Sequence, residues 1–153
     1  RLDDDASVLL RFDNGARGLL HASQIAAGEE NNLRLRVYGE KGSIDWSQME
    51  PNSLVVRWLD QPMQVYRTGV GSLFPEATIH SRVPSGHPEG YLEAFANIYR
   101  DVAFCIQARL NGQTPDPLYR DFPSVEDGVR GMRFIETVIR SGHSDVKWIE
   151  LQN

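Results

Sequence analysis

The sequence predicts a two-layer α+β fold: a large, mostly antiparallel sheet of about six or seven strands, with two main helices packed on one face. Short alternating runs separated by turn residues fill residues 6–67. Two segments with helical periodicity follow at 88–110 and 124–141, and a β-rich run closes the sequence at 146–151. A chain of 153 residues has the usual size of one domain, so residues 1–153 are expected to share a single core.

The strands are predicted from period-two alternation and from turn residues. Val8, Leu10 and Phe12 occupy alternate positions, and Asp13-Asn14-Gly15 then supplies residues that tolerate a tight hairpin turn. The returning strand is expected at 16–27. Further strands are expected at 33–38, 43–46, 54–59 and 63–67.

One of these strands predicts a surface for self-association. Leu33, Leu35 and Val37 alternate with Arg34, Arg36 and Tyr38, so the first three are expected to face the core. Two helices cover only one face of such a sheet, and a large open sheet face usually marks an interface. Arg34, Arg36 and Tyr38 are therefore predicted to lie on an open face through which the chain forms a homo-oligomer.

The helices are predicted from apolar residues at helical spacing. Residues 69–88 show no sustained period and are expected to form a long loop that serves a site or an interface. Pro88 favours a helix start and Asn111-Gly112 a helix end, while Ser124 and Asp127 resemble a capping box for the second helix. The expected buried stripes are Tyr91, Phe95, Ile98, Val102 and Ile106 in the first helix and Val125, Val129, Met132, Ile135 and Ile139 in the second.

Composition argues against several functional classes. The net charge is -5 and no stretch is rich in Lys or Arg, so nucleic acid is not an expected partner. Apolar runs are too short to span a membrane, and the single cysteine, Cys105, favours a reducing, cytoplasmic location. The four histidines lack metal-ligand spacing, so no metal is expected. Neither a G-x-G-x-x-G nor a P-loop pattern occurs, so the chain alone is not expected to bind a dinucleotide.

His87 is the residue best placed to hold a ligand, because Pro88 restricts its backbone at the entrance of a predicted helix. An alternative is structural. In that interpretation His87 caps the helix and Glu89 complements the positive end of the helix dipole.

Three segments together resemble the C-terminal part of the Gfo/Idh/MocA family, which includes glucose-fructose oxidoreductase and inositol dehydrogenase. They are Val-Tyr-Gly-Glu-Lys-Gly-Ser-Ile-Asp-Trp at 37–46, the segment 86–101 that contains His87, and Asp-Phe-Pro-Ser-Val-Glu-Asp-Gly at 121–128. The resemblance runs in order over about residues 6–151. It implies an N-terminal Rossmann domain for NAD or NADP outside this chain, and a sugar-type substrate.

The family's catalytic residues are not expected here. The resemblance implies a Lys in a Glu-Lys-Pro segment and an Asp-x-x-x-His motif, whereas Lys41 lies in Gly-Glu-Lys-Gly and no Asp is followed by His four residues later. The fragment is therefore expected to contain no catalytic residue and to bind no cofactor alone. Since the family places the corresponding loop toward the sugar pocket, His87, Glu89 and Tyr91 are the expected substrate-binding residues.

Two functions remain open from the sequence. The start at Arg1, without an initiator Met, suggests a piece of a longer protein. In the leading interpretation this piece shapes the substrate pocket and subunit interface of an NAD(P)-dependent oxidoreductase that acts on a sugar, polyol or related cyclic alcohol, and it is inactive alone. The alternative is a stand-alone interaction or dimerisation module without catalysis.

Overall fold

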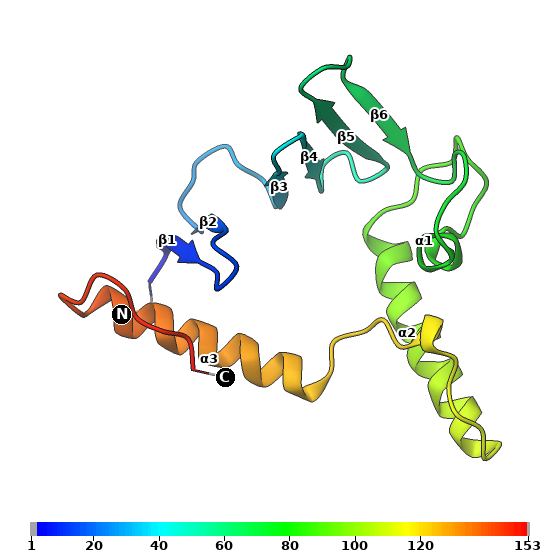
Figure 1. The fold of residues 1–153 in the computed structure, drawn as a ribbon. Helices are drawn as coiled ribbons and strands as arrows, with labels where there is room; N and C mark the ends of the chain where they lie inside the picture. The colour runs from blue at the N-terminus through cyan, green and yellow to red at the C-terminus, as the bar shows by residue number, and fades with distance from the viewer. Residues whose placement is uncertain (1–2, 153) are drawn as a thin grey trace. The chain divides into compact units, whose positions relative to one another are not determined.

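The computed structural model describes residues 3–152, so the start at Arg1 lies outside the described residues. The chain divides into two compact units. We call Arg1–Glu30 with Pro123–Asn153 the hairpin unit and Asn31–Phe122 the sheet unit. Each contains strands and a long helix, which confirms the α+β class (Figure 1).

The hairpin unit contains β1 (Asp5–Arg11), β2 (Arg17–Ser23) and α3 (Val125–Gly142). β1 and β2 pair antiparallel, with Val8 opposite Leu20. The predicted turn is confirmed, because Gly15 has a φ of 87° and its amide donates to the Phe12 carbonyl at 2.9 Å. The capping box is confirmed too: Ser124 N donates to Asp127 Oδ2 at 2.9 Å, and Asp127 N donates to Ser124 Oγ at 3.2 Å.

The sheet unit begins with an antiparallel meander in the order β3 (Arg34–Tyr38), β4 (Gly42–Ser47), β5 (Ser53–Trp58) and β6 (Gln64–Arg67). It continues with α1 (Pro75–His80), α2 (Tyr91–Leu110) and a 3-10 turn, η1 (Pro117–Tyr119). α2 ends as predicted, with Gly112 at a φ of 67°, where a glycine avoids the steric cost of a left-handed backbone.

Several predicted details are wrong. One large sheet was expected, but the strands form one two-stranded and one four-stranded sheet. β2 ends at Ser23, and a ten-residue connection without strand structure precedes β3. Residues 146–151 form no strand, and Trp148 there stacks against the Arg11 guanidinium at 3.8 Å. The short helix α1 was not predicted, and α2 begins at Tyr91 instead of Pro88.

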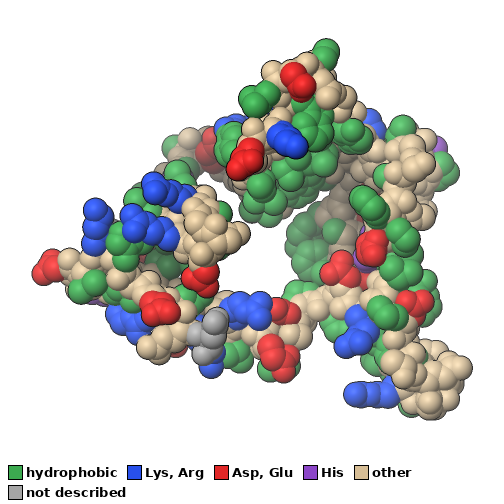
Figure 2. Space-filling model, in the orientation of Figure 1, with side chains coloured by type: hydrophobic (Ala, Val, Ile, Leu, Met, Phe, Trp, Pro, Cys, Tyr) green, Lys and Arg blue, Asp and Glu red, His purple; other side chains and the backbone are tan. Residues whose placement is uncertain are grey.

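The four-stranded sheet has one apolar and one charged face. The predicted alternation is confirmed, since Arg36 pairs with Asp45 and Val37 with Ile44. The predicted burial of Leu33, Leu35 and Val37 is wrong: they are 58%, 58% and 49% exposed, and Val56 is the one buried hydrophobic residue in the described part. Hydrophobic side chains gather over this sheet in Figure 2.

The helices also differ from the predicted stripes. No residue of α3 in the described range is buried, and its predicted stripe is exposed from Val125 to Ile139. In α2 the buried residues are polar, namely Asn97 and Asp101, whereas Tyr91, Phe95, Ile98 and Ile106 are exposed. No helix within residues 3–152 is long and apolar enough to cross a membrane.

Candidate functional site

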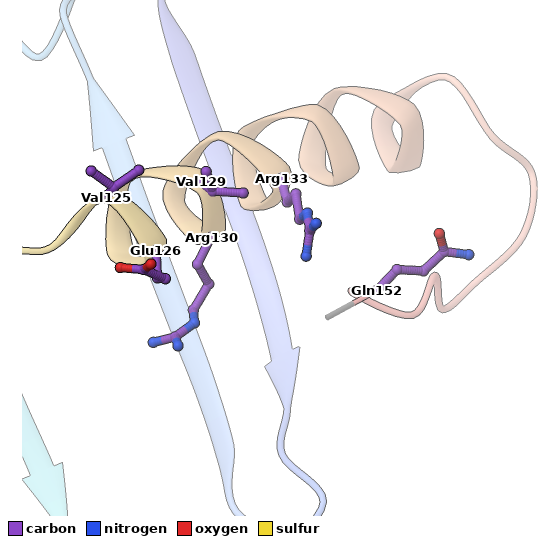
Figure 3. Close-up of a pocket in the computed structure, with 6 residues that line it drawn as sticks. All are labelled: Val125, Glu126, Val129, Arg130, Arg133 and Gln152. Atoms are coloured by element: carbon purple, nitrogen blue, oxygen red, sulfur yellow. The ribbon is translucent and has the colours of Figure 1, made fainter.

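A pocket in the hairpin unit does not coincide with any predicted site. It has a volume of about 290 Å³, at the lower limit for ligand pockets, and is lined by Val125, Glu126, Val129, Arg130, Arg133 and Gln152 (Figure 3). None of the predicted substrate residues belongs to it. The predicted substrate residues lie instead in the sheet unit, in and next to the segment that contains His87.

The His87 loop, defined as residues 82–89, is closed by its own ends. The amide of Arg82 donates to Glu89 Oε1 at 2.7 Å. Within the loop, Gly86 has a φ of 88°, a conformation that favours glycine and turns the chain toward His87. A hydrogen bond between the Arg82 backbone and the Glu89 side chain thus closes the loop, with His87 near its C-terminal end.

The ring of His87 is oriented by a single carbonyl. Its backbone N donates to the Pro84 carbonyl at 3.2 Å, and its Nδ1 lies 3.0 Å from the same oxygen. Because a carbonyl only accepts, Nδ1 carries the hydrogen of a neutral ring and Nε2 becomes an acceptor. Nε2 bonds to none of the described residues, and the side chain is exposed. His87 can therefore accept a hydrogen bond from a ligand hydroxyl.

The helix-cap alternative for His87 does not match the helix boundaries. α2 begins at Tyr91 with Gly90 as its N-cap, and Gly90 N donates to Glu93 Oε2 at 2.8 Å. The pKa of Glu93 is lowered, first of all by this backbone hydrogen bond. Glu93, and not His87, satisfies the start of the helix.

The other two predicted substrate residues have different surroundings. Glu89 uses its carboxylate to close the loop, and its main chain pairs on both sides with the side chain of Asn52. Tyr91 is 66% exposed, and its ring centroid lies 4.7 Å from that of Phe95. Of the three, His87 and Tyr91 offer exposed groups to a ligand.

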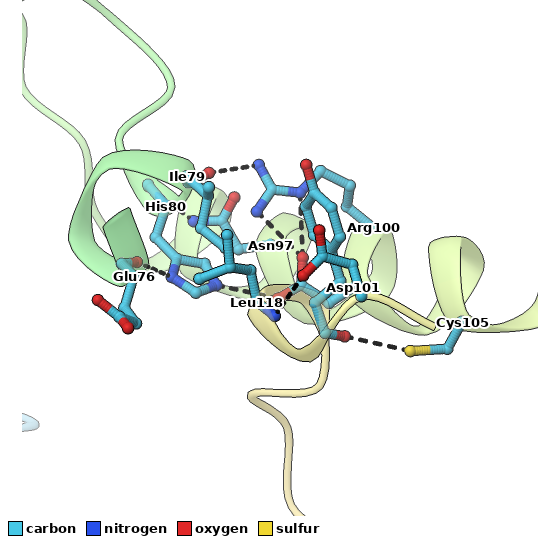
Figure 4. A network of polar contacts seen from close by, with 10 residues as sticks. Glu76, Ile79, His80, Asn97, Arg100, Asp101, Cys105 and Leu118 are labelled. Atoms are coloured by element: carbon cyan, nitrogen blue, oxygen red, sulfur yellow. Dashed lines mark hydrogen bonds and ion pairs between the residues drawn. The ribbon is translucent and has the colours of Figure 1, made fainter. Parts of the chain in front are cut away.

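A buried polar network near the start of the loop was not predicted from the sequence (Figure 4). Asp101 is fully buried and accepts from His80 Nε2 at 2.9 Å and from Arg100 Nη2 at 3.0 Å. His80 Nδ1 lies 2.7 Å from the Glu76 carbonyl, so both ring nitrogens face acceptors and both bonds form only with a doubly protonated ring.

Burial alone would raise the pKa of Asp101, but the hydrogen bonds from His80 and Arg100 outweigh it and hold the pKa below 3.8. Two neighbouring side chains also bind the backbone at the end of α1. Arg100 Nη1 donates to the Ile79 carbonyl at 2.7 Å, and Asn97 Nδ2 donates to the His80 carbonyl at 2.9 Å. The network therefore fastens the end of α1, just before the His87 loop, to α2. In the sequence, this network could have been suspected from the polar residues that interrupt the apolar pattern of α2.

The predicted interface residues surround a second carboxylate, on the charged face of the sheet. Asp45 is buried, and Arg34 Nη2, Arg57 Nη1 and Arg36 Nε lie 2.8, 3.4 and 3.5 Å from its Oδ2. The hydrogen bond from Arg34 is the main cause that lowers the pKa of Asp45 to about 2. Tyr38, at the end of β3, is 73% exposed.

Comparison with known proteins identifies the family. Residues 1–151 match the C-terminal α/β domain of an oxidoreductase family. The chain belongs to the Gfo/Idh/MocA family. An uncharacterized oxidoreductase of Bacillus subtilis, YfiI, is 34% identical over 152 residues, which cover 99% of this chain and 38% of the relative.

Solved structures of similar proteins share the fold of this Gfo/Idh/MocA domain. An oxidoreductase from Sinorhizobium meliloti is 42% identical, with a TM-score of 0.90 over 98% of this chain and 42% of that one. An inositol dehydrogenase homolog from Azotobacter vinelandii, complexed with NADH and myo-inositol, is 33% identical, with a TM-score of 0.86 over 97% of this chain and 39% of its own. This chain thus spans about two fifths of the length of its relatives.

Proposed function

We propose that the protein that contains this chain oxidises a CH–OH group of a sugar, polyol or related cyclic alcohol with NAD or NADP. In this proposal the chain forms part of the substrate pocket and the subunit interface and is inactive alone. The observation that carries it is the exposed, unpaired Nε2 acceptor of His87 on a loop whose ends are tied. Support also comes from the family and from the Azotobacter homolog with NADH and myo-inositol.

The chemistry assigns a limited role to this chain. A bound nicotinamide would supply the acceptor for the hydride of the carbinol carbon, and a base would take the hydroxyl proton. We place the cofactor site in an N-terminal Rossmann domain, and the base in the part of the protein that precedes this chain. His87 accepts a hydrogen bond from a non-reacting hydroxyl, Tyr91 offers a phenolic group and an apolar ring face, and Glu89 holds the loop closed.

The charged sheet face is the proposed contact between copies of the chain. Arg34 and Arg36 are held by Asp45 and retain unused donors, and Tyr38 extends the surface at the end of β3. Arginine and tyrosine are favoured residue types at interfaces. We place the protein in the cytoplasm, as its unpaired thiol, Cys105, favours a reducing compartment.

A non-catalytic interaction module is the second candidate. It is favoured by the exposed apolar face of the sheet, where Leu35, Trp58 and Tyr66 are 58%, 40% and 55% exposed. The two candidates differ in one measurement, which is reduction of a nicotinamide nucleotide.

The test is to incubate the complete protein with NAD⁺ or NADP⁺ and with myo-inositol, D-glucose or glycerol, and to follow formation of the reduced nucleotide. Turnover with a cyclic alcohol that exceeds turnover with glycerol is the expected result. Absence of turnover with both nucleotides and all three alcohols would contradict the proposal and favour the interaction module.

A further inference from the structure

One residue outside the His87 loop binds the segment between β6 and α2, residues 68–90, to the sheet. Asn52 lies in the turn between β4 and β5 and is half-buried. Its Nδ2 donates to the Glu89 carbonyl at 2.8 Å, and its Oδ1 accepts from the Glu89 amide at 3.0 Å. The amide side chain thus pairs with both sides of one residue, as a neighbouring strand would.

The backbone of Asn52 also binds the N-terminal end of this segment. Its backbone carbonyl accepts from the amide of Thr68 at 3.1 Å, directly after β6. Next to Thr68, Gly69 approaches Ser85 so closely that a Cβ added at residue 69 would lie 3.4 Å from the Ser85 amide nitrogen. One residue therefore joins both ends of the segment that contains α1 and His87.

The connection from Asn52 to the His87 ring contains few free torsions. Glu89 is two residues from His87, and the intervening Pro88 has a φ fixed by its ring and restricts the backbone of His87 as well. The ring itself is held by the Pro84 carbonyl. The position of the Glu89 peptide consequently determines where Nε2 of His87 is presented.

We infer that Asn52 is a positioning residue for the substrate: it touches no substrate itself and sets the location of His87 through Glu89. This inference rests on the proposed function of His87. The residue type is specific, because aspartate would keep the acceptor for the Glu89 amide but place a second acceptor opposite the Glu89 carbonyl. Alanine would remove both bonds.

The experiment uses the complete protein and the variants Asn52→Ala, Asn52→Asp, His87→Ala and the double variant Asn52→Ala/His87→Ala. The matched control is Asn111→Ala, since the side chain of Asn111, just after α2, is exposed and accepts a hydrogen bond from Gln107 of the same helix. The measurements are kcat and KM for myo-inositol, Kd for NADH, and hydrogen exchange of peptides covering residues 82–90.

We expect Asn52→Ala and Asn52→Asp to lower kcat/KM by up to about tenfold without changing Kd for NADH, and to speed exchange in 82–90. In the His87→Ala background, Asn52→Ala should add less than about twofold, because both changes remove one function. The control should match the wild type.

Two results overturn the inference. One is a double variant in which the losses multiply; the other is unchanged exchange of residues 82–90 in both Asn52 variants. Two other results refute the proposed role of His87: a kcat/KM of His87→Ala equal to that of the wild type, or no turnover by either protein. In both cases the exchange measurement still decides whether Asn52 holds the loop.

Discussion

His80 Nε2 lies 2.9 Å from Asp101 Oδ2, and this hydrogen bond joins the last residue of α1 to the middle of α2. Arg100 completes the coordination of the same carboxylate. A fully buried charge is stable only when it is paired and hydrogen-bonded, so the stability of the sheet unit should depend on this residue more than on any exposed acid.

Replacement of Asp101 tests this dependence. Asp101→Asn would direct an amide donor at Arg100 or His80 and leave a cation unpaired. We expect the free energy of unfolding to fall by about 2–3 kcal/mol, less than for a fully buried pair, because His80 and Arg100 side chains remain 25% and 23% exposed. Urea unfolding measures it, with Asp60→Asn in the exposed turn after β5 as the control. Equal stabilities of the two variants would contradict the prediction.

The second carboxylate predicts a pH dependence. The pKa of Asp45 is lowered from 3.8 to about 2 in the folded chain, so the unfolded state binds more protons between these values. The stability that Asp45 contributes is fully present above pH 3.8 and is lost as the pH falls toward 2. We expect Asp45→Asn to be less stable than the wild type at pH 6, with the difference shrinking as the pH falls to 2.

Unfolding by urea at several pH values gives this difference. Asp101, Asp127 and Glu93, whose pKa values are also lowered, are present in both proteins, and their contributions cancel. A difference that stays constant over the whole range would show that Asp45 does not act through its charge.

The strands were largely predictable from sequence because alternation and turn residues are local. Gly15, at a φ of 87°, lies in the predicted turn, and β3 pairs with β4 across the predicted turn at 39–42. Whether a sheet face is covered depends on residues far away in the sequence, so alternation does not predict it. Leu35 and Val37 have the expected alternation yet are exposed. α1 has only six residues, too few for a helical repeat to be visible.

In the candidate site, too, features set by neighbouring residues were predictable and contacts between distant residues were not. The Pro after His87 was visible in the sequence, but the Asn52 bonds to Glu89 join residues 37 positions apart. For α2, the apolar stripe predicted the wrong buried face because Asn97 and Arg100 each donate a side-chain hydrogen bond to a backbone carbonyl of α1. The Oδ1 atom of Asn97 is buried with no hydrogen-bond partner among the described residues. Hydrogen-bond partners from another element cannot be deduced from helical periodicity.

The charged sheet face predicts a change in self-association. Arg36→Glu would place a second carboxylate beside Asp45 and remove one of the arginines of the proposed interface. Like charges at an interface are costly, so we expect the dimer dissociation constant to rise tenfold or more. Sedimentation equilibrium measures it, with Arg109→Glu in the last turn of α2 as the control. A strictly monomeric wild type, or an unchanged constant in Arg36→Glu, would contradict the prediction.

The 153-residue chain by itself should fold but bind no NADH. Neither phosphate-binding glycine pattern occurs in the sequence, and the proposed cofactor site lies in another domain. Calorimetric titration of the isolated chain with NADH should show no heat of binding. Saturable binding at micromolar concentration would refute the division of roles between this chain and the Rossmann domain.

The last prediction concerns His87 in the complete protein. If its Nε2 accepts a hydrogen bond from a neutral, non-reacting hydroxyl, His87→Ala removes about 0.5–1.5 kcal/mol and lowers kcat/KM for myo-inositol by up to about tenfold. Loss of a general base would usually cost about 100-fold or more, so the size of the effect separates the two roles. The Kd for NADH and the melting temperature should stay unchanged. His143→Ala, at the C-cap of α3, is the matched control. A melting temperature that falls by several degrees while kcat/KM is unchanged would show that His87 only supports the loop.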